Sequence, residues 1–239
     1  MLKKNKIVVT GGSGRFGSIL KKIKTNNKIY FPTKKELDIL KIISIKKYLQ
    51  KYKPNIIIHL AGLSRPMELH DKDISKSIKL NIIGTSNIVL AAKNFNTKVI
   101  YFSTSYIYPG KKGNYSEGNS ILPINNYAWS KLGGEAAVQM YKNSLILRVC
   151  MTEEPFIHKK AFYNVKTNFI FQKEIAKILF KILKKKGVLN VGGEIDTIYN
   201  FAKKNNPHVK KISRSNNKFF KKYPNPSMNI SKLKKIIKK

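Results

Sequence analysis

Tyr127 and Lys131 are the two residues whose type and spacing most strongly indicate chemistry in this chain. They lie four positions apart in a segment expected to be helical, so both should lie on one face, about one turn apart. An ammonium near a phenol favours the ionised phenolate and lowers the tyrosine pKa from its usual value of about 10. Such a tyrosine can exchange a proton with a carbonyl or hydroxyl group. In a lysine-rich chain the spacing alone is weak, and it gains weight from the elements that precede it.

A glycine-rich segment near the N-terminus is placed where a phosphate-binding loop would be. It directly follows the apolar stretch Lys6–Thr10 and opens a helix-like segment. Gly11 would allow a tight turn, Gly14 a close approach of the backbone to a pyrophosphate, and Gly17 close helix–strand packing. The helix N-terminus offers unpaired N–H groups to the phosphates. The predicted cofactor-binding residues of this loop are Gly11, Gly14, Arg15, Phe16 and Gly17.

The end of the second expected strand bears on which dinucleotide binds. A carboxylate there would bond the ribose 2′-hydroxyl and repel a 2′-phosphate. The chain reads Tyr-Phe-Pro-Thr-Lys-Lys over residues 30–35, and its next acid is Glu36. Arg15, with Lys34 or Lys35, could pair a 2′-phosphate. The sequence therefore favours NADP(H), with NAD(H) as the alternative.

Hydroxyl side chains follow the apolar stretch Lys98–Ser103. Ligands of doubly wound sheets bind beyond the carboxyl ends of the strands, so Thr104 or Ser105 should face a substrate. A hydroxyl there could bond a reacting carbonyl oxygen and stabilise its developing negative charge. Taken alone these hydroxyls could equally cap the strand end, but with Tyr127 downstream we favour a catalytic role.

Short apolar stretches alternate with longer helix-like segments along the chain, which indicates right-handed βαβ crossovers. The expected strands are Lys6–Thr10, Lys28–Phe31, Asn55–Leu60, Lys98–Ser103 and Leu145–Val149. The expected helices are Arg15–Thr25, Ser44–Tyr52, Ser75–Phe95, Tyr127–Lys142 and Gln172–Lys186. The predicted fold is α/β, a Rossmann-type doubly wound parallel sheet with a small C-terminal region.

The regular alternation loosens after the fifth strand. We expect residues 1–150 to form an NAD(P)-binding Rossmann domain and residues 151–239 a reduced substrate-binding region that does not fold independently. Within the latter, residues 152–167 should be irregular, followed by a helix and a short strand over residues 188–191. Residues 231–239 could form a last helix, with cations favourably placed near its C-terminus.

Composition limits the class of protein. A hydrophobic content of 42% over 239 residues can supply an ordinary core. The net charge of +36 invites a nucleic-acid partner, but only four of the 48 basic residues are arginines. Bidentate phosphate and base contacts favour arginine, so we expect no specific nucleic-acid binding. We also expect no metal site, because the histidines have no metal-ligand spacing; they are His59, His70, His158 and His208.

Cysteine usage and hydropathy bear on the compartment. Cys150 is the only cysteine, which excludes an intrachain disulfide and fits a reducing environment. No apolar run approaches the length of a membrane span or makes a signal-peptide core. We expect a cytoplasmic protein that has no membrane partner.

Taken in order, these motifs resemble the extended short-chain dehydrogenase/reductases that act on nucleotide sugars. The likeness is greatest to the dTDP-4-dehydrorhamnose reductases and extends to the nucleotide-sugar epimerases. The glycines have the family's G-x-x-G-x-x-G spacing, and Ser103–Tyr108 resembles S-T-D-Y-V-F. The resemblance covers about residues 6–150 and implies a keto-sugar reductase that uses NAD(P)H.

The resemblance implies roles for individual residues. Asp38 should face the adenine, and Asn81 should order the active-site lysine through water. The implied catalytic residues are Thr104, Tyr127, Lys131 and Asn81. The further cofactor-binding residues are Asp38, Ile39, Leu60, Ala61 and Gly62, with Tyr127 and Lys131. The expected substrate-binding residues are Ser105, Tyr106 and Arg148, although a structural ion pair is as good an account of Arg148.

Departures from the family pattern bear on the reaction. The dehydratases carry Thr-Asp-Glu at the strand-four site, whereas Ser105 and Tyr106 supply no carboxylate, which favours a reductase or an epimerase. Ser105 also replaces an Asp common in the rhamnose reductases, and the C-terminal part is short. We expect reduction of a nucleotide-linked keto-sugar. The alternatives are a nucleotide-sugar epimerase and a non-catalytic dinucleotide-binding protein, and a homodimer is left open.

Overall fold

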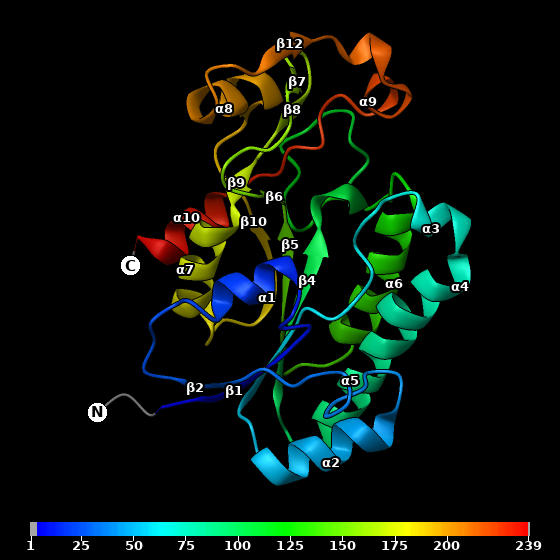
Figure 1. Ribbon diagram of the computed structural model, residues 1–239, viewed down its shortest axis with the longest axis vertical. Helices are drawn as coiled ribbons and strands as arrows, with labels where there is room; N and C mark the ends of the chain where they lie inside the picture. Colours follow the sequence, from blue (N-terminus) through cyan, green and yellow to red (C-terminus); the bar gives the residue numbers. More distant parts are fainter. Residues whose placement is uncertain (1–3, 239) are drawn as a thin grey trace. The chain divides into compact units, whose positions relative to one another are not determined.

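The computed structural model, which describes residues 4–238, has a central six-stranded sheet in the order β10-β5-β4-β3-β1-β2 (Figure 1). β1 pairs in parallel with β2 and β3, and β3 pairs in parallel with β4. The strands are β1 (Lys6–Thr10), β2 (Lys28–Tyr30), β3 (Ile56–His59), β4 (Lys98–Thr104), β5 (Ser144–Val149) and β10 (Gly187–Val191). The strand order reverses between β1 and β3, the point at which doubly wound sheets bind ligands. The predicted doubly wound fold is confirmed.

The chain divides into two compact units. The first comprises the chain up to Ser103, with Asn126–Leu147 and Leu183–Val188. The second comprises Thr104–Asn125, Arg148–Ile182 and the chain from Leu189 onward. No helix of the described residues is long and apolar enough to cross a membrane.

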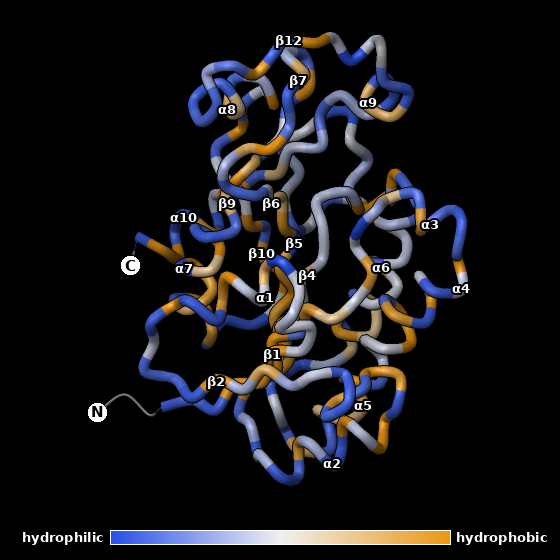
Figure 2. Tube along the Cα trace, viewed as in Figure 1, coloured by the Kyte–Doolittle hydropathy of each residue, from blue (hydrophilic) through white to orange (hydrophobic). Residues whose placement is uncertain are grey.

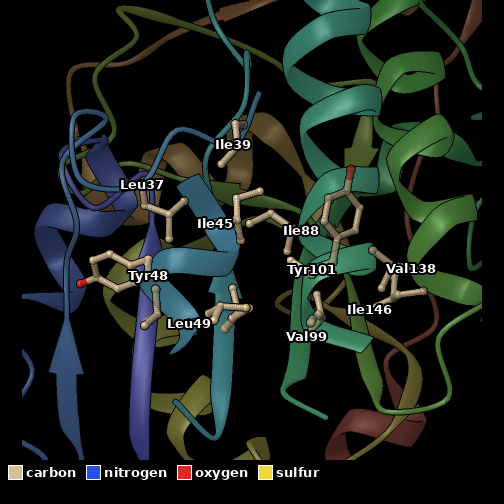
Figure 3. Close-up of a cluster of buried hydrophobic side chains, with 14 residues drawn as sticks. Leu37, Ile39, Ile45, Tyr48, Leu49, Ile88, Val99, Tyr101, Val138 and Ile146 are labelled. Atoms are coloured by element: carbon tan, nitrogen blue, oxygen red, sulfur yellow. The ribbon is translucent and has the colours of Figure 1, made fainter. Parts of the chain in front are cut away.

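Helices cover both faces of the sheet in the first unit. α2 (Ile42–Tyr52), α5 (Gly84–Asn94) and α6 (Asn126–Gln139) bury apolar stripes in one cluster with alternate strand residues (Figure 3). Figure 1 shows α5 and α6 side by side. Alternate residues of a strand face opposite sides, so Tyr101 lies in this cluster while Phe102 contacts Phe16 of α1 (Arg15–Leu20) on the other face. Figure 2 shows the apolar β1 as an orange segment.

Two predicted helices differ most from the observed ones. α1 ends at Leu20 and not at Thr25, because the N–H groups of Lys22 and Ile23 bond carbonyls three residues back and the chain leaves the α-helical pattern there. The helix expected over residues 75–95 is interrupted: α4 (Ile74–Ser77) is followed by the π-helix η1 (Ile78–Ile83) and then by α5. The wide π turn contains the buried Asn81, and such turns are frequent at functional sites.

The second unit is built from short elements. Its two-stranded sheets pair β12 (Lys210–Ile212) with β7 (Lys160–Phe162), β11 (Asp196–Thr197) with β8 (Lys166–Thr167), and β6 (Met151–Thr152) with β9 (Ile170–Phe171). Its helices are η2 (Ser105–Ile107), α7 (Gln172–Ile182), α8 (Ile198–Asn205), η3 (Arg214–Asn216), α9 (Lys218–Lys222) and α10 (Ser231–Ile237). The stretch expected to be irregular, residues 152–167, is irregular over 153–159 and 163–165 but also contains β7 and β8, and Ala161 and Val165 pack in a small core with Ala202 of α8.

Candidate active site

The glycine-rich loop between β1 and α1 makes the predicted tight turn. Gly11 has a φ of +71°, and its carbonyl accepts a hydrogen bond of 3.0 Å from the Gly14 N–H. A Cβ atom on Gly11 would lie 2.6 Å from the Ala61 nitrogen, so this loop contacts the turn that follows β3. The contact joins two of the segments predicted to bind cofactor, the glycine loop and Leu60–Gly62. A Cβ atom on Gly17 would lie 2.6 Å from the backbone of Gly12, so the close packing at Gly17 is against the loop itself and not against a strand as expected.

The side chains of this loop and of the turn after β2 differ in exposure and in hydrogen bonding. Phe16 is buried with its ring centroid 5.1 Å from that of Phe102, so only its backbone would be available to a cofactor, whereas Arg15 is exposed. The Glu36 carboxylate accepts hydrogen bonds from the Thr33 N–H at 2.7 Å and hydroxyl at 2.9 Å. Those bonds lower the pKa of Glu36, which is therefore a turn-stabilising carboxylate.

Asp38 and Ile39 follow this turn. The Asp38 side chain is half-buried, and one of its carboxylate oxygens accepts a 3.0 Å hydrogen bond from the Leu40 N–H. The Ile39 side chain belongs to the buried core, and its carbonyl accepts a bond from Asn87. Ile39 can thus meet a ligand only through its backbone.

Asn81 ties the turn after β3 to the start of α6. Its amide oxygen accepts from the Leu63 N–H at 2.7 Å, and its amide nitrogen donates to the Leu63 carbonyl at 2.8 Å. The same nitrogen donates to the Ser130 hydroxyl at 2.8 Å, and that hydroxyl donates to the Tyr127 carbonyl. The side chain of Asn81 is thus committed to positioning the backbone around Tyr127.

Tyr127 is the second residue of α6 and is half-buried. Its ring meets the edge of His70, on α3 (Leu69–Lys72), with centroids 5.1 Å apart. The Asn126 amide before it donates to Asp71 at 2.8 Å, which fixes α3 against the same helix start. These contacts place the Tyr127 ring at the beginning of α6, against α3.

Lys131 follows one turn later on α6. Its ammonium nitrogen lies 4.1 Å from the ring centroid of Tyr101. Burial lowers the pKa of Lys131 to about 7, and the charge of Glu135 opposes this fall. A lysine with this pKa can hold or lose its proton near neutral pH, as an acid/base site requires.

Thr104 and its neighbours begin the second unit. The buried Thr104 hydroxyl accepts a bond from the Tyr106 N–H at 3.2 Å and so caps η2. Ser105 is buried and its hydroxyl bonds the Cys150 thiol, whereas the half-buried Tyr106 packs its ring on Phe219. The roles of these residues toward a substrate stay predictions.

Arg148 lies in a buried polar network of the second unit. Its guanidinium donates to the Tyr108 hydroxyl at 2.8 Å and to the Glu117 carbonyl at 3.1 Å. The Tyr108 hydroxyl in turn donates to the Asn190 amide oxygen at 2.8 Å. These bonds give Arg148 a framework role, and its contact with substrate stays a prediction.

Several buried polar residues around the site were not singled out from the sequence as contributors to it. They are Thr10, His59, His70, Thr85, Tyr101 and Ser130. Their signal was a polar or aromatic residue inside an otherwise aliphatic strand, or facing inward from a helix. Recognising it requires the strand register, which the sequence alone does not provide. Within residues 4–238 no group of His, Cys, Asp and Glu side chains is arranged to hold a metal.

A doubly wound sheet with a glycine loop after its first strand and a Tyr/Lys pair on one helix defines the class of short-chain dehydrogenase/reductases. Within that class the chain belongs to the family described as RmlD substrate binding domain, whose family model matches residues 5–166. The predicted resemblance to the dTDP-4-dehydrorhamnose reductases is confirmed.

Two curated relatives illustrate how far the similarity reaches. The chain is 29% identical over 152 residues to a dTDP-4-dehydrorhamnose reductase from Aggregatibacter actinomycetemcomitans, covering 62% of this chain and 51% of the relative. It is 30% identical over 152 residues to methionine adenosyltransferase 2 subunit beta from Xenopus laevis, covering 59% of this chain and 45% of the relative. The chain spans about half the length of these curated relatives.

Solved structures share the fold over most of the chain. A dTDP-4-dehydrorhamnose reductase from Bacillus anthracis, in complex with NADP, has a TM-score of 0.79 at 22% identity and covers 89% of this chain and 85% of its own. A hypothetical dTDP-4-dehydrorhamnose reductase from Sulfolobus tokodaii has a TM-score of 0.83 at 23% identity, with coverages of 97% and 94%. A UDP-glucose 4-epimerase from Thermus thermophilus, in complex with NAD, has a TM-score of 0.75 at 14% identity, with coverages of 96% and 92%.

Proposed function

We propose that this protein reduces a nucleotide-linked keto-sugar with NAD(P)H. The observation that carries the proposal is the pair of Tyr127 and Lys131 on α6, held by the Asn81–Ser130 bonds to the turn that contacts the glycine loop. A proton donor is thus fixed to the same framework as the expected phosphate-binding backbone. Membership in the RmlD family supports the same reaction class.

Each residue has a defined task in this reaction. When bound, NAD(P)H would supply the hydride that reduces the sugar carbonyl. Tyr127 would donate its proton to the forming alkoxide, and the Lys131 ammonium would favour the resulting phenolate. Thr104 would donate a hydrogen bond to the carbonyl oxygen, and Asn81 would keep the α6 backbone in place.

The glycine loop fits a dinucleotide pyrophosphate. Gly14 is exposed and precedes the N-terminus of α1, where backbone N–H groups can bond phosphate oxygens. For the ribose, the exposed Arg15 and the absence of an acid before Glu36 support a 2′-phosphate and hence NADP(H). Structural neighbours with NADP and with NAD both occur, so NAD(H) is the alternative to be tested.

The proposed substrate-binding residues belong to the second unit. We assign residues 151–239 to nucleotide-sugar binding, together with Ser105 and Tyr106 of the segment after β4. A nucleotide-sugar needs cations for its pyrophosphate and an apolar wall for its base. The exposed Lys159 and Lys160 and the partly exposed Tyr163 lie in one stretch and meet both needs.

Two rival functions use the same fold. An epimerase would oxidise and reduce the sugar without net cofactor turnover, and the fold of the UDP-glucose 4-epimerase supports this alternative. A non-catalytic dinucleotide-binding protein is the second rival, and the chain is also similar to a protein named as a subunit of methionine adenosyltransferase. The retained Tyr127 and Lys131 support an active enzyme over that second rival.

One assay separates the three. NADPH oxidation should be followed spectrophotometrically with a panel of nucleotide-linked 4-keto sugars, and sugar products should be quantified in parallel. A reductase consumes one NADPH per product formed, whereas an epimerase converts sugar without consuming NADPH. Tight NADPH binding with no sugar conversion across the panel would contradict the enzyme proposal and favour the binding protein.

A further inference from the structure

Three buried side chains, each of which can hydrogen-bond, lie side by side across the central sheet. The strand register places Thr10 of β1 beside His59 of β3, and His59 beside Tyr101 of β4. Their exposed fractions are 2%, 1% and 0%. Groups buried this deeply among aliphatic strands must find hydrogen-bond partners inside the protein.

The hydrogen bonds of this row run in one direction. The Thr85 hydroxyl lies 2.7 Å from the Asn81 carbonyl, which can only accept, so Thr85 donates there. It therefore accepts from His59 Nε2 at 3.1 Å, and His59 Nδ1 accepts from the Thr10 hydroxyl at 2.7 Å. Thr10 in turn accepts from the Ala61 N–H. His59 is thus a neutral imidazole protonated at Nε2, in agreement with a pKa that burial lowers to about 3.

Tyr101 joins this row to Lys131 by two contacts. Its hydroxyl donates to the Lys131 carbonyl at 2.9 Å, and its ring lies under the Lys131 ammonium at 4.1 Å. Burial holds the pKa of Tyr101 well above 10, so the ring stays a neutral phenol. Helix α6 can come this close because residue 134 is glycine: a Cβ atom there would lie 2.7 Å from the Tyr101 oxygen.

The His59 ring supports the Tyr101 ring from the neighbouring strand. The two centroids are 6.0 Å apart, and the ring planes differ by 28°. Because His59 is held neutral by Thr10 and Thr85, it adds no second positive charge beside Lys131. The packing fixes the position of Tyr101, and the hydrogen bonds fix the position of His59.

We propose that the face of the Tyr101 ring binds and positions the Lys131 ammonium, and that the neutral His59 ring holds the Tyr101 ring in place. The inference rests on the proposed function, in which Lys131 assists Tyr127. An aromatic face attracts a cation through its quadrupole, most strongly where water is excluded. Tyr101 is therefore a positioning residue that keeps Lys131 protonated against the cost of burial.

Other groups act on the same ammonium. From α6 itself, Glu135 favours the charged form and Tyr127 lies one turn away. From β3 comes the neutral His59, and from α3 comes His70, whose pKa burial also lowers. Since both imidazoles are neutral near pH 7, Tyr101 and Glu135 are the groups that favour the protonated lysine.

A fluorination series at position 101 tests the inference while preserving the ring. Tyr101→Phe removes only the hydroxyl, and replacement by mono-, di- and trifluorophenylalanine then weakens the negative ring face with little change in shape. The primary readout is the pKa of Lys131, followed by NMR of isotopically labelled lysine and assigned by the signal missing in Lys131→Met. We expect this pKa to fall stepwise, by about one pH unit from Phe to trifluorophenylalanine.

The pH profile of kcat/KM gives a second readout. If the ammonium is the active form, the basic limb of the profile should move to lower pH in step with the Lys131 titration. A control series at Tyr52, whose ring lies 5.3 Å from the Lys51 ammonium, should leave the Lys131 titration unchanged.

A Lys131 pKa that is the same from Phe to trifluorophenylalanine would overturn the inference and leave Tyr101 as a core residue only. The titration needs no substrate, so it separates this inference from the proposed function. A stepwise fall of the Lys131 pKa in a protein that converts no sugar would contradict the proposed activity but support the role of Tyr101 in positioning Lys131.

Discussion

Each unit of this protein holds a cation against the ring of a fully buried tyrosine, and the two pairs differ in what else the cation contacts. In the first unit the Lys131 ammonium lies 4.1 Å from the Tyr101 ring centroid. In the second, the Arg148 guanidinium lies 5.1 Å from the Tyr108 ring centroid. The same pairing thus occurs once with a lysine and once with an arginine.

The Arg148–Tyr108 pair belongs to a network of hydrogen bonds. Arg148 donates to the Tyr108 hydroxyl, Tyr108 donates to Asn190, and the Asn190 amide donates to the carbonyls of Tyr115 and Asn229. A guanidinium stays charged at every pH at which proteins fold. This network therefore has one protonation state and serves the framework.

In the Lys131–Tyr101 pair the ammonium can lose its charge. In Tyr101 the hydroxyl bonds the Lys131 backbone and not its ammonium, and burial lowers the pKa of that ammonium to about 7. A buried cation becomes a reactive group when it can titrate near working pH and a structural one when it cannot. Substitutions in both units test this difference.

The largest expected effect belongs to the first unit. Tyr127→Phe keeps the ring and its contact with His70 but removes the transferable proton. We expect turnover to fall by about 10²–10⁴, the usual weight of general acid/base catalysis. Steady-state kinetics measures this loss, and the Kd for NADPH should hardly change. Turnover near that of the unsubstituted enzyme would show that another group donates the proton.

Arg148→Met should act on stability instead. It leaves the buried Tyr108 hydroxyl and Glu117 carbonyl without their donor, which should lower the free energy of unfolding by about 2–4 kcal/mol. Urea titration measures the loss. Arg148→Lys is the matched control, since it keeps the charge but loses the planar fork. If urea titration shows no loss while KM for the sugar rises sharply, Arg148 is a substrate ligand.

Arg15→Ala should weaken NADPH binding by about 1.5–3 kcal/mol, the range of a hydrogen bond to a charged group. NADH binding should stay nearly the same, because it lacks the 2′-phosphate. Calorimetric or fluorescence titrations with both cofactors measure the difference, with Lys24→Ala as an exposed-cation control. Equal losses for the two cofactors would reverse the preference for NADP(H).

Lys131→Met should change how stability depends on pH. The folded-state pKa of Lys131, about 7, lies below its usual 10.5, so the unfolded chain binds the extra proton between these values. Stability should therefore rise with pH above about 7 through this residue, and the variant should lack that rise. Urea midpoints of both proteins from pH 6 to 9 measure the difference. Parallel pH curves would mean that burial does not perturb Lys131.

The parts of the site that the sequence predicted are those coded by local order. Gly11 and the Tyr127/Lys131 spacing lie within single turns, so their geometry follows from a few neighbouring residues. The resemblance implied that the segment Leu60–Gly62 binds cofactor, but it did not predict the contact between Gly11 and Ala61.

The parts of the site that the sequence did not predict depend on the register of the strands. Thr10, His59 and Tyr101 are separated by more than forty residues from one to the next and become neighbours only when β1, β3 and β4 pair. The π-helix around Asn81 likewise depends on packing against α6, which helical periodicity does not encode. The sequence could therefore predict the Tyr127/Lys131 pair but not the buried row of side chains beside Lys131.

The most direct test of the account follows one hydride. NADPH deuterated at nicotinamide C4, in each of its two stereochemical forms, should be incubated with the nucleotide-linked 4-keto sugar that the panel assay selects, and the product examined by mass spectrometry and NMR. We expect one of the two forms to transfer one deuterium to the reduced sugar carbon for each NADPH consumed. A sugar product that carries no deuterium from either form would contradict it.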